Sequence, residues 1–287
     1  MTGKKVIIIG GTGFIGRPFV KKLFKKQFLE ITVIHRNPVG STFKVKGVIY
    51  KRINVAKDKE RVKGLLKNCQ YLIIFTPPNI NALKNMLFDE QRHFKKILFA
   101  SSILLYSSGL KKHTEDSEPA PLTDYEVRKF KEEKILQNFV KNKSVKLAIA
   151  RIGNVYGTSE DKGFINIVFE CMRDGKVVKI NGNGNQKRDF IFIDDVVETL
   201  EFILNYKQEK RVEVFNVCSG TVTSLLQIIH LIERVAGKKI KYDITSRIKE
   251  KTVVLTSNRK ITNLSHLKIK YDIENGLKKA YRNFIDA

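Results

Sequence analysis

The sequence has few cysteines, no metal-ligand pattern and no long apolar run. Its three cysteines (Cys69, Cys171 and Cys218) are odd in number and far apart, which excludes a disulfide framework or a cysteine metal site, and we expect buried free thiols. The five histidines form no ligand spacing either, so no metal is predicted. No apolar run approaches the roughly 18 residues of a membrane span, and the amino terminus lacks the layout of a signal peptide. The sequence therefore predicts a cytoplasmic protein without an integral membrane segment.

Acidic residues are also scarce. The chain has 54 Lys and Arg against 29 Asp and Glu, a formal net charge of +25. A nucleic-acid-binding protein is expected to gather such charge on one face, but here the lysines are scattered along the chain, so we expect a solvated basic surface and no nucleic-acid partner. A positive field of this kind attracts anionic substrates and leaves open a weak attraction to an anionic membrane surface.

A glycine-rich turn follows the first apolar run. Val6 to Ile9 predict a strand buried on both faces, as in a parallel sheet. Gly10 allows a tight turn after this strand, Gly13 lets backbone approach a pyrophosphate, and Gly16 lets the next helix pack close to the strand. That helix, expected over Phe14–Phe24, offers free N–H groups and a positive dipole end to phosphates. The pattern predicts a dinucleotide-binding site.

The first half of the chain alternates short apolar runs with helical ones, which predicts a doubly wound parallel sheet. A long helix is expected from Asp124 to about Lys141, with Asp124 as its N-cap, before a further strand at Leu147–Ala150. The segment 37–47 is too short for a crossover helix and is predicted to be a loop. The other expected strands are Ile31–Ile34, Val48–Ile53, Tyr71–Phe75 and Ile97–Ala100, and the other expected helices are Lys59–Lys67 and Ala82–Phe94.

Beyond Arg151 the pattern changes, and glycine alternates with asparagine over 181–185. We expect a smaller α/β lobe beside the sheet, with the ligand at the carboxyl ends of the strands, in the cleft between the lobes. Residues 1–157 are predicted to form the nucleotide-binding domain and 158–287 mainly the substrate lobe, with about 186–220 returning to the first domain. The expected elements here are strands at Phe190–Ile193 and Val214–Val217 and helices from Asp194, over Thr223–Ala236 and near Glu274–Phe284.

Tyr125 and Lys129 lie four residues apart on the expected long helix, hence on one face. A free tyrosine has a pKa of about 10, and a nearby ammonium favours the phenolate and lowers that pKa. Such a pair can move a proton in an alcohol–ketone interconversion. A solvated helix face would also explain the pair, but Ser101 and Ser102 follow a buried strand, where a hydroxyl can hold a substrate oxygen near the tyrosine.

The order of these motifs resembles the short-chain dehydrogenase/reductase superfamily: Gly10-x-x-Gly13-x-x-Gly16, Ser101-Ser102, then Tyr125-x-x-x-Lys129. Three later segments are similar to its extended branch, the nucleotide-sugar epimerases, dehydratases and 4-keto reductases. They are residues 151–157 (RIGNVYG), 182–196 (GNGNQKRDFIFIDDV) and 215–220 (FNVCSG). The resemblance spans nearly the whole chain and implies a Rossmann-type fold.

The resemblance also implies roles for individual residues. Tyr125 would be the acid–base residue, Lys129 would bind the nicotinamide ribose and tune the tyrosine, and Ser102 would contact the reacting oxygen. Asn154 and Arg188 would bind the diphosphate of a sugar nucleotide, and Arg247 stands near the position of a second diphosphate arginine. The residues expected to bind the cofactor are Gly10, Gly13, Phe14, Ile15, Gly16, Arg36, Asn37, Thr76, Tyr125 and Lys129.

Two departures from the family's patterns narrow the chemistry. The dehydratases carry an Asp-Glu pair where this chain has Leu104-Leu105, and leucine cannot protonate a leaving hydroxyl, so dehydration is disfavoured. The cysteine and histidine of the family's epimerase-reductases have no counterpart here, so a 3,5-epimerisation is not expected.

Three functions remain. The first is an oxidoreductase acting at C4 of a nucleotide-linked, 4-keto-6-deoxy sugar. The second is a 4-epimerase that oxidises and re-reduces its substrate with a retained cofactor, NAD. The third, a non-catalytic nucleotide-binding protein, is disfavoured by an intact Ser102, Tyr125 and Lys129. The expected partner is a nucleotide-diphosphate sugar, and a homodimer stays open. The compact length favours the reductase over the epimerase.

The end of the second expected strand bears on the cofactor. Binders of unphosphorylated dinucleotides usually place a carboxylate about 20 residues after the glycines. Here residues 31–39 contain no Asp or Glu, and Arg36 can pair with a 2′-phosphate, with His35 adding a hydrogen bond. Stacking of Arg36 on adenine is the alternative. The sequence therefore predicts a preference for NADP(H), with NAD(H) as the other candidate, and this too favours a biosynthetic reductase.

Overall fold

In the computed structural model, two compact units alternate along the chain. The structure describes residues 4–25, 29–38, 40, 44–76, 79–87, 94–158, 160, 162–245 and 251–286. The first unit comprises Met1–Ser101, Val127–Ala150 and Val197–Phe215, and the second Ser102–Glu126, Arg151–Val196 and Asn216–Ala287. The second unit therefore takes in residues before 157 and holds about as many residues as the first, whereas the sequence predicts a smaller lobe.

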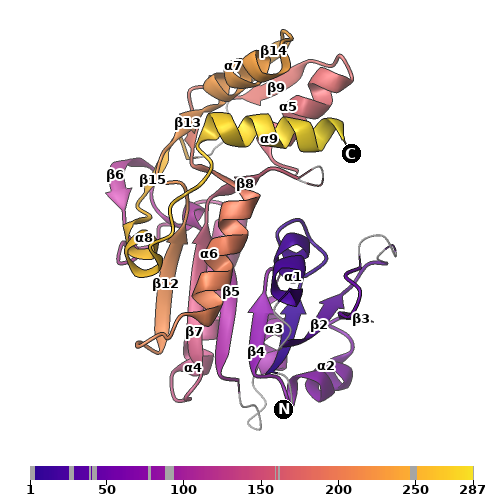
Figure 1. The fold of residues 1–287 in the computed structure, drawn as a ribbon. Coiled ribbons are helices and arrows are strands. Elements are labelled where there is room, and N and C mark those ends of the chain that lie inside the picture. The colour runs from indigo at the N-terminus through magenta and orange to yellow at the C-terminus, as the bar shows by residue number, and fades with distance from the viewer. Residues whose placement is uncertain are drawn as a thin grey trace. The chain divides into compact units, whose positions relative to one another are not determined.

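A seven-stranded parallel sheet organises the first unit (Figure 1). Its strand order is the doubly wound order with one further strand added, so the topological switch lies between β1 and β4. The register pairs Ile8 with Val33 of β2 and with Ile73 of β4. In spatial order the strands are β12 (Val212–Val217), β7 (Lys146–Ile152), β5 (Lys96–Ser102), β4 (Tyr71–Ile74), β1 (Lys4–Ile9), β2 (Leu29–His35) and β3 (Ile49–Arg52).

Helices cover both faces of this sheet. On one face α2 (Lys59–Leu66), α3 (Ile80–Leu87) and α4 (Asp124–Val140) share one apolar cluster with Ile7 and Ile9 of β1. On the other lie α1 (Gly16–Phe24) and α6 (Ile193–Asn205), drawn in front of the strands in Figure 1 and joined by an ion pair of 3.4 Å between Lys22 and Glu201. Successive side chains of β1 therefore point into the apolar layers on opposite faces of the sheet. This explains why the apolar run of β1 is unbroken.

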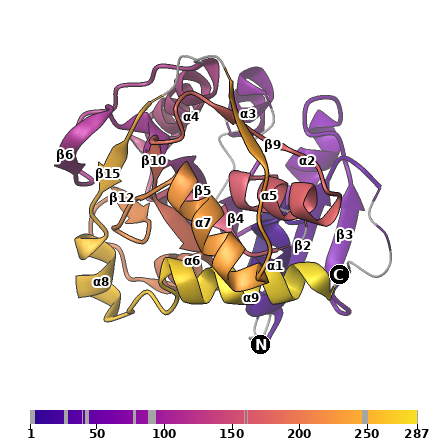
Figure 2. The same ribbon diagram turned by 90° about the horizontal axis from the view of Figure 1, so that it is seen from above.

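The second unit consists of short paired strands and a group of helices. The helices α5 (Phe164–Arg173), α7 (Leu225–Ala236) and α9 (Ile273–Ile285) lie together (Figure 2), with the Phe169 ring 5.7 Å from that of Tyr281. The unit also contains a short 3₁₀ helix, η2 (Ile103–Leu105), and the helix α8 (Arg259–Ser265). Its paired strands are β8 (Asn154–Tyr156) with β11 (Phe190–Phe192), β9 (Val178–Asn181) with β14 (Tyr242–Thr245), β6 (Gly109–His113) with β15 (Val254–Thr256), and β10 (Lys187–Arg188) with β13 (Thr223–Ser224).

The predicted elements that fall on described residues are present, and their ends differ by one or two residues. The predicted helix Ala82–Phe94 is seen as α3 (Ile80–Leu87), and its continuation over 88–93 and part of the predicted loop at 37–47 lie outside the described residues. The predicted N-cap of the long helix is wrong: Asp124 is already helical, and the hydroxyl of Thr123 accepts the N–H of Glu126 at 3.4 Å. The side chain of Glu126 accepts the N–H of Thr123 at 3.5 Å, a capping box. Cys69 and Cys218 are buried as expected, but Cys171 is half-buried. In the described part of the chain, no helix has the length and apolarity to cross a membrane.

Candidate active site

The glycine loop between β1 and α1 has the geometry that a pyrophosphate site requires. Gly10 adopts φ +79°, which favours glycine, and turns the chain at the end of β1. A Cβ on Gly16 would overlap the carbonyl oxygen of Gly10, so α1 packs too close for any side chain there. A Cβ on Gly13 would meet only this oxygen, at 3.3 Å, and Gly13 is exposed. Backbone at Gly13 is therefore open to a ligand, and its contact with a pyrophosphate stays a prediction.

Thr76 completes this loop from the other side of the topological switch. A Cβ on Gly10 would come within 2.9 Å of the Thr76 hydroxyl oxygen, so the second residue after β4 packs against the turn after β1. Phe14 and Ile15 lie half-buried between Gly13 and α1, and Ile15 provides no side-chain cap to that helix. In the first turn of α1, the N–H of Arg17 donates to the carbonyl of Gly13 at 2.9 Å, and Pro18 has no N–H. What α1 offers a phosphate is therefore mainly the positive end of its dipole.

Basic side chains follow the ends of β2 and β3. Arg36 and Asn37 come directly after β2 and are exposed, and the register places Arg52 beside His35. The Nε of Arg52 donates to the carbonyl of Arg36 at 3.3 Å, and a ring nitrogen of His35 lies 2.8 Å from the carbonyl oxygen of Asn37. Two arginines therefore stand at the carboxyl ends of neighbouring strands, β2 and β3. Residues 31–39 contain no carboxylate that could bind ribose hydroxyls.

Lys129 is buried in the first unit, where α4 packs against the end of β5. Its ammonium donates to the carbonyl of Ala100 at 3.0 Å and lies 3.3 Å from the Glu132 carboxylate. Burial lowers the pKa of Lys129, and the Glu132 carboxylate partly offsets this effect. Beside it, the Ser101 hydroxyl donates to Glu133 at 2.5 Å. The ammonium is thus held at a fixed place, which its predicted role requires.

Ser102 and Tyr125 belong to the second unit. The hydroxyl of Ser102 accepts the N–H of Leu104 at 3.2 Å and so caps the short helix η2, which leaves its O–H free to donate to a substrate oxygen. Tyr125 is 44% exposed in the first turn of α4, one turn before Lys129 along the same helix. The exposed phenol is accessible to a substrate, and the catalytic roles of Ser102, Tyr125 and Lys129 stay predictions.

Asn154 and Arg188 line one cavity of about 390 Å³ in the second unit. They come from neighbouring short strands: the N–H of Asn154 donates to the carbonyl of Asp189 at 2.8 Å. The guanidinium of Arg188 donates to the carbonyl of Lys251 at 2.9 Å, which orients it. Lys179 adds a second cation, Phe164 and Phe190 add aromatic rings, and no carboxylate lines the cavity among the residues described there. Its size, charge and rings suit a nucleoside diphosphate.

Asp189 fixes the strand that carries Arg188. Its carboxylate is buried and accepts the N–H groups of Ser219 at 2.8 Å and of Gly220 at 2.9 Å. Burial raises the pKa of Asp189 to about 6, although these two hydrogen bonds favour the charged form. The segments around 188 and 219, distant in sequence, are thereby joined next to Arg188.

One predicted site residue lies outside the described part of the structure, and two residues near the site were not identified from the sequence. Arg247, the second predicted diphosphate arginine, lies outside the described residues. Lys251 and Glu126 were missed; they form a buried ion pair of 2.8 Å in the second unit. The Thr-x-x-Glu pattern at 123–126 indicates the cap at Glu126, but no local pattern indicates its distant partner. In the ranges that the structure describes, no cluster of His, Cys, Asp and Glu is arranged to hold a metal ion.

A doubly wound sheet with a glycine loop at its topological switch defines a nucleotide-binding protein of the Rossmann type. Residues 79–218 match the model of the NAD dependent epimerase/dehydratase family. The chain contains a domain of this family and is homologous to the nucleotide-sugar epimerases, dehydratases and reductases of the extended short-chain dehydrogenase/reductase branch. It is an enzyme of that NAD-dependent class, and the motifs predict this class; the preference for NADP(H) stays a prediction.

Individual relatives differ in their activity. An uncharacterised UDP-glucose epimerase of Bacillus subtilis is 28% identical over 273 residues, which are 85% of this chain and 86% of that protein. The dTDP-4-dehydro-6-deoxyglucose reductase of Escherichia coli is 26% identical over 262 residues, 82% of each chain. The UDP-glucuronic acid 4-epimerase of Bacillus cereus, solved with UDP-glucuronic acid and NAD, superposes with a TM-score of 0.89 at 21% identity, covering 98% of this chain and 99% of that one. This last likeness concerns the fold.

Proposed function

We propose that this chain reduces the 4-keto group of a nucleotide-linked, 4-keto-6-deoxy sugar. The observation that carries the proposal is the Tyr125–Lys129 pair on α4, with Lys129 held beside the end of β5 and Tyr125 exposed at the start of the helix. When bound at the glycine loop, the nicotinamide cofactor supplies the hydride. Tyr125 gives its phenolic proton to the 4-oxygen, Ser102 donates a hydrogen bond to the same oxygen, and the charge of Lys129 favours the resulting phenolate.

The proposed substrate follows from the cavity around Arg188. Two cations, three side-chain amides and aromatic rings in about 390 Å³ suit a nucleoside diphosphate, with Arg188 and Asn154 on its phosphate oxygens. The 4-epimerase is the second candidate, since one curated relative is named a UDP-glucose epimerase and one structural neighbour is a 4-epimerase. Leu104 and Leu105 form part of η2, where a dehydratase needs its acid, so dehydration is not proposed.

The basic side chains at the carboxyl ends of β2 and β3 support a reductase over an epimerase. Arg36 and Arg52 offer two guanidinium groups for a 2′-phosphate, and residues 31–39 offer no carboxylate for an unphosphorylated ribose. We therefore propose that NADPH is preferred. An epimerase that regenerates its own cofactor has little need of the phosphorylated form.

A panel of nucleotide sugars and their 4-keto-6-deoxy derivatives tests the reaction, with the absorbance of reduced nicotinamide followed over time. Net consumption of reduced cofactor with a keto substrate is expected. Interconversion of two nucleotide sugars without net consumption would identify a 4-epimerase instead. Tyr125→Phe should lower turnover about a hundredfold or more while both ligands still bind, because only the proton donor is removed.

Arg36→Asp tests the cofactor. The wild type should have the higher kcat/KM with NADPH, and the variant should shift preference toward NADH, because an aspartate repels a 2′-phosphate and binds ribose hydroxyls. A wild type that prefers NADH tenfold would contradict the proposed role of Arg36 and remove the main support for a reductase.

A further inference from the structure

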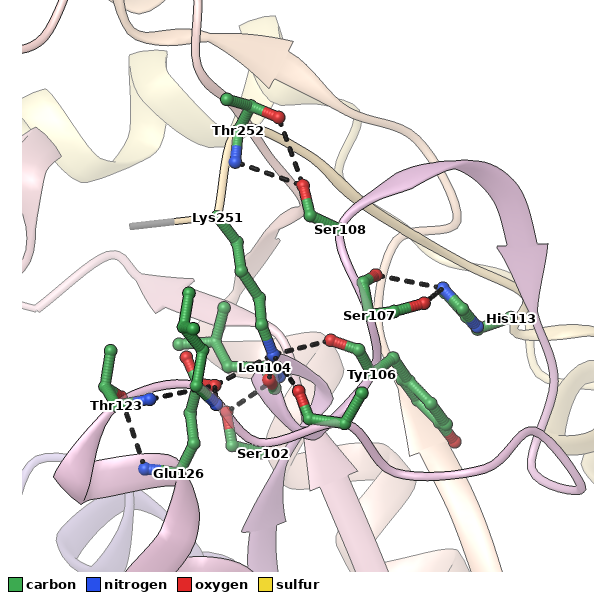
Figure 3. A network of polar contacts seen from close by, with 12 residues as sticks. Ser102, Leu104, Tyr106, Ser107, Ser108, His113, Thr123, Glu126, Lys251 and Thr252 are labelled. Atoms are coloured by element: carbon green, nitrogen blue, oxygen red, sulfur yellow. Dashed lines mark hydrogen bonds and ion pairs between the residues drawn. The ribbon is translucent and has the colours of Figure 1, made fainter. Parts of the chain in front are cut away.

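Lys251 lies at the centre of a polar network in the second unit (Figure 3). It is 6% exposed, and its ammonium lies 2.8 Å from the Glu126 carboxylate. The same ammonium donates to the carbonyls of Tyr106 at 2.6 Å, Ala120 at 3.0 Å and Leu104. The ammonium therefore joins three segments: the turn after β5, the segment between β6 and α4, and the first turn of α4.

On one side, this network fixes the residue next to Tyr125. The Glu126 carboxylate also accepts the N–H of Leu122 at 2.6 Å, so it joins Lys251 to the capped start of α4. Burial raises the pKa of Glu126, but hydrogen bonds from Lys251 and Leu122 outweigh this effect and hold the pKa below its ordinary value. The Glu126 carboxylate is thus charged, and its contacts with Lys251 and Leu122 set the position of the first turn of α4.

On the other side, the network reaches Ser102 and Arg188. Leu104 accepts the Lys251 ammonium through its carbonyl and donates its N–H to the Ser102 hydroxyl. The backbone carbonyl of Lys251 accepts the Arg188 guanidinium at 2.9 Å. One residue therefore contacts the neighbours of both predicted catalytic groups and the predicted diphosphate arginine, all within the second unit.

A contribution to fold stability is a weak explanation for the buried Lys251–Glu126 ion pair. Burying two charges costs desolvation energy, and apolar side chains of similar volume often stabilise a fold as well or better. A charged pair does, however, fix a geometry, because each hydrogen bond has a direction. We propose that Lys251 is a positioning residue that holds Tyr125 and Ser102 at a fixed place relative to Arg188, so that a substrate bound by its diphosphate presents its 4-oxygen to both. The inference rests on the proposed function.

The test compares four variants with the wild type. Lys251→Met alone leaves a buried, unpaired Glu126 and is expected to fold poorly. The double variant Lys251→Met, Glu126→Gln removes both charges and keeps the volume, and it is the main test. Lys251→Arg keeps the charge. Lys96→Met is the matched control: Lys96 is 5% exposed in the first unit, and its ammonium donates to the carbonyls of Ile203 at 2.5 Å and Tyr206 at 2.9 Å.

In the double variant kcat should fall about 10- to 100-fold, since small misplacements of reacting groups cost this much. The KM for the nucleotide sugar should change by less than about threefold, because the backbone carbonyl that orients Arg188 remains. Lys251→Arg should recover most of kcat. Lys96→Met should lower the midpoint of thermal unfolding and leave kcat unchanged. A double variant with the kcat of the wild type would overturn the inference, as would an equal loss of kcat in Lys96→Met.

A second measurement separates positioning from general damage. The Lys251→Met, Glu126→Gln pair is also introduced into the Tyr125→Phe variant. There it should lower the residual kcat far less than it lowers kcat of the wild type, because the Tyr125 hydroxyl that Lys251 positions is already absent. Equal losses on both backgrounds would overturn the inference. If the wild type turns over no nucleotide sugar, the proposed function fails and the inference with it. Normal turnover with an unaffected double variant overturns the inference alone.

Discussion

Gly16→Ala should separate helix packing from phosphate binding in the glycine loop. The new Cβ would overlap the carbonyl oxygen of Gly10 and lie 2.6 Å from Cα and 2.8 Å from the carbonyl carbon of Gly11. All three are backbone atoms, so no side chain can rotate away, and α1 must move by roughly 1 Å to restore ordinary contacts of 3.4–4 Å.

Overpacking of this kind costs about 1–3 kcal/mol. For a chain of this length that cost corresponds to a fall of about 2–12 °C in Tm. Cofactor affinity should fall as well, because a displaced α1 moves the positive end of its dipole away from the phosphates.

Gly13→Ala is the matched variant. Its Cβ would meet only the Gly10 oxygen, at 3.3 Å, so the Tm should stay within about 2 °C of the wild type. The methyl group would stand on the surface that faces the pyrophosphate, and affinity for the cofactor should fall about tenfold or more, equivalent to about 1.4 kcal/mol. Gly64→Ala, in α2 with nothing within 4 Å, should raise stability by up to about 1 kcal/mol.

Thermal unfolding gives the three Tm values, and a titration of reduced nicotinamide cofactor, followed by its own fluorescence, gives the affinities. The chain contains no tryptophan, so protein emission interferes little. The reasoning is refuted if Gly16→Ala keeps the wild-type Tm, or if Gly13→Ala binds the cofactor as tightly as the wild type.

Two further perturbations test the second unit. The pKa of Asp189 is raised to about 6 from 3.8, so its protonated form stabilises the fold at low pH, and about 3 kcal/mol of this stabilisation is lost as the pH rises from about 4 through 6. Urea unfolding across this range should show the wild type losing stability relative to Asp189→Asn, and parallel pH profiles would contradict the assignment. Ser224→Ala should cost about 1 kcal/mol, because the Ser224 hydroxyl accepts the N–H of Gln227 at 3.2 Å in a capping box; the unfolding midpoint in urea measures it, and an unchanged midpoint would refute the cap.

Residues close together in the sequence determined much of this fold. The run Val6–Ile9 and the three glycines predicted a buried strand, a tight turn and a closely packed helix, because hydrophobic period and glycine conformation are local properties. The spacing of Tyr125 and Lys129 placed both on one helix for the same reason. The family domain and the class of enzyme followed from the order of such local motifs, whereas reductase and epimerase share those motifs and are not separated by them.

Tertiary structure alone decided how distant segments combine. The N-cap is Thr123 and not the predicted Asp124, because the Glu126 side chain completes a capping box with Thr123. Glu126 is in turn paired with Lys251, 125 positions later in the chain. No sequence period links such positions, since their contact depends on how strands and loops pack. Likewise Asn154 of β8 and Arg188 of β10 share a cavity because β8 pairs with β11, which begins two residues after Arg188. The two compact units alternate along the chain because later segments return to the parallel sheet of the first unit.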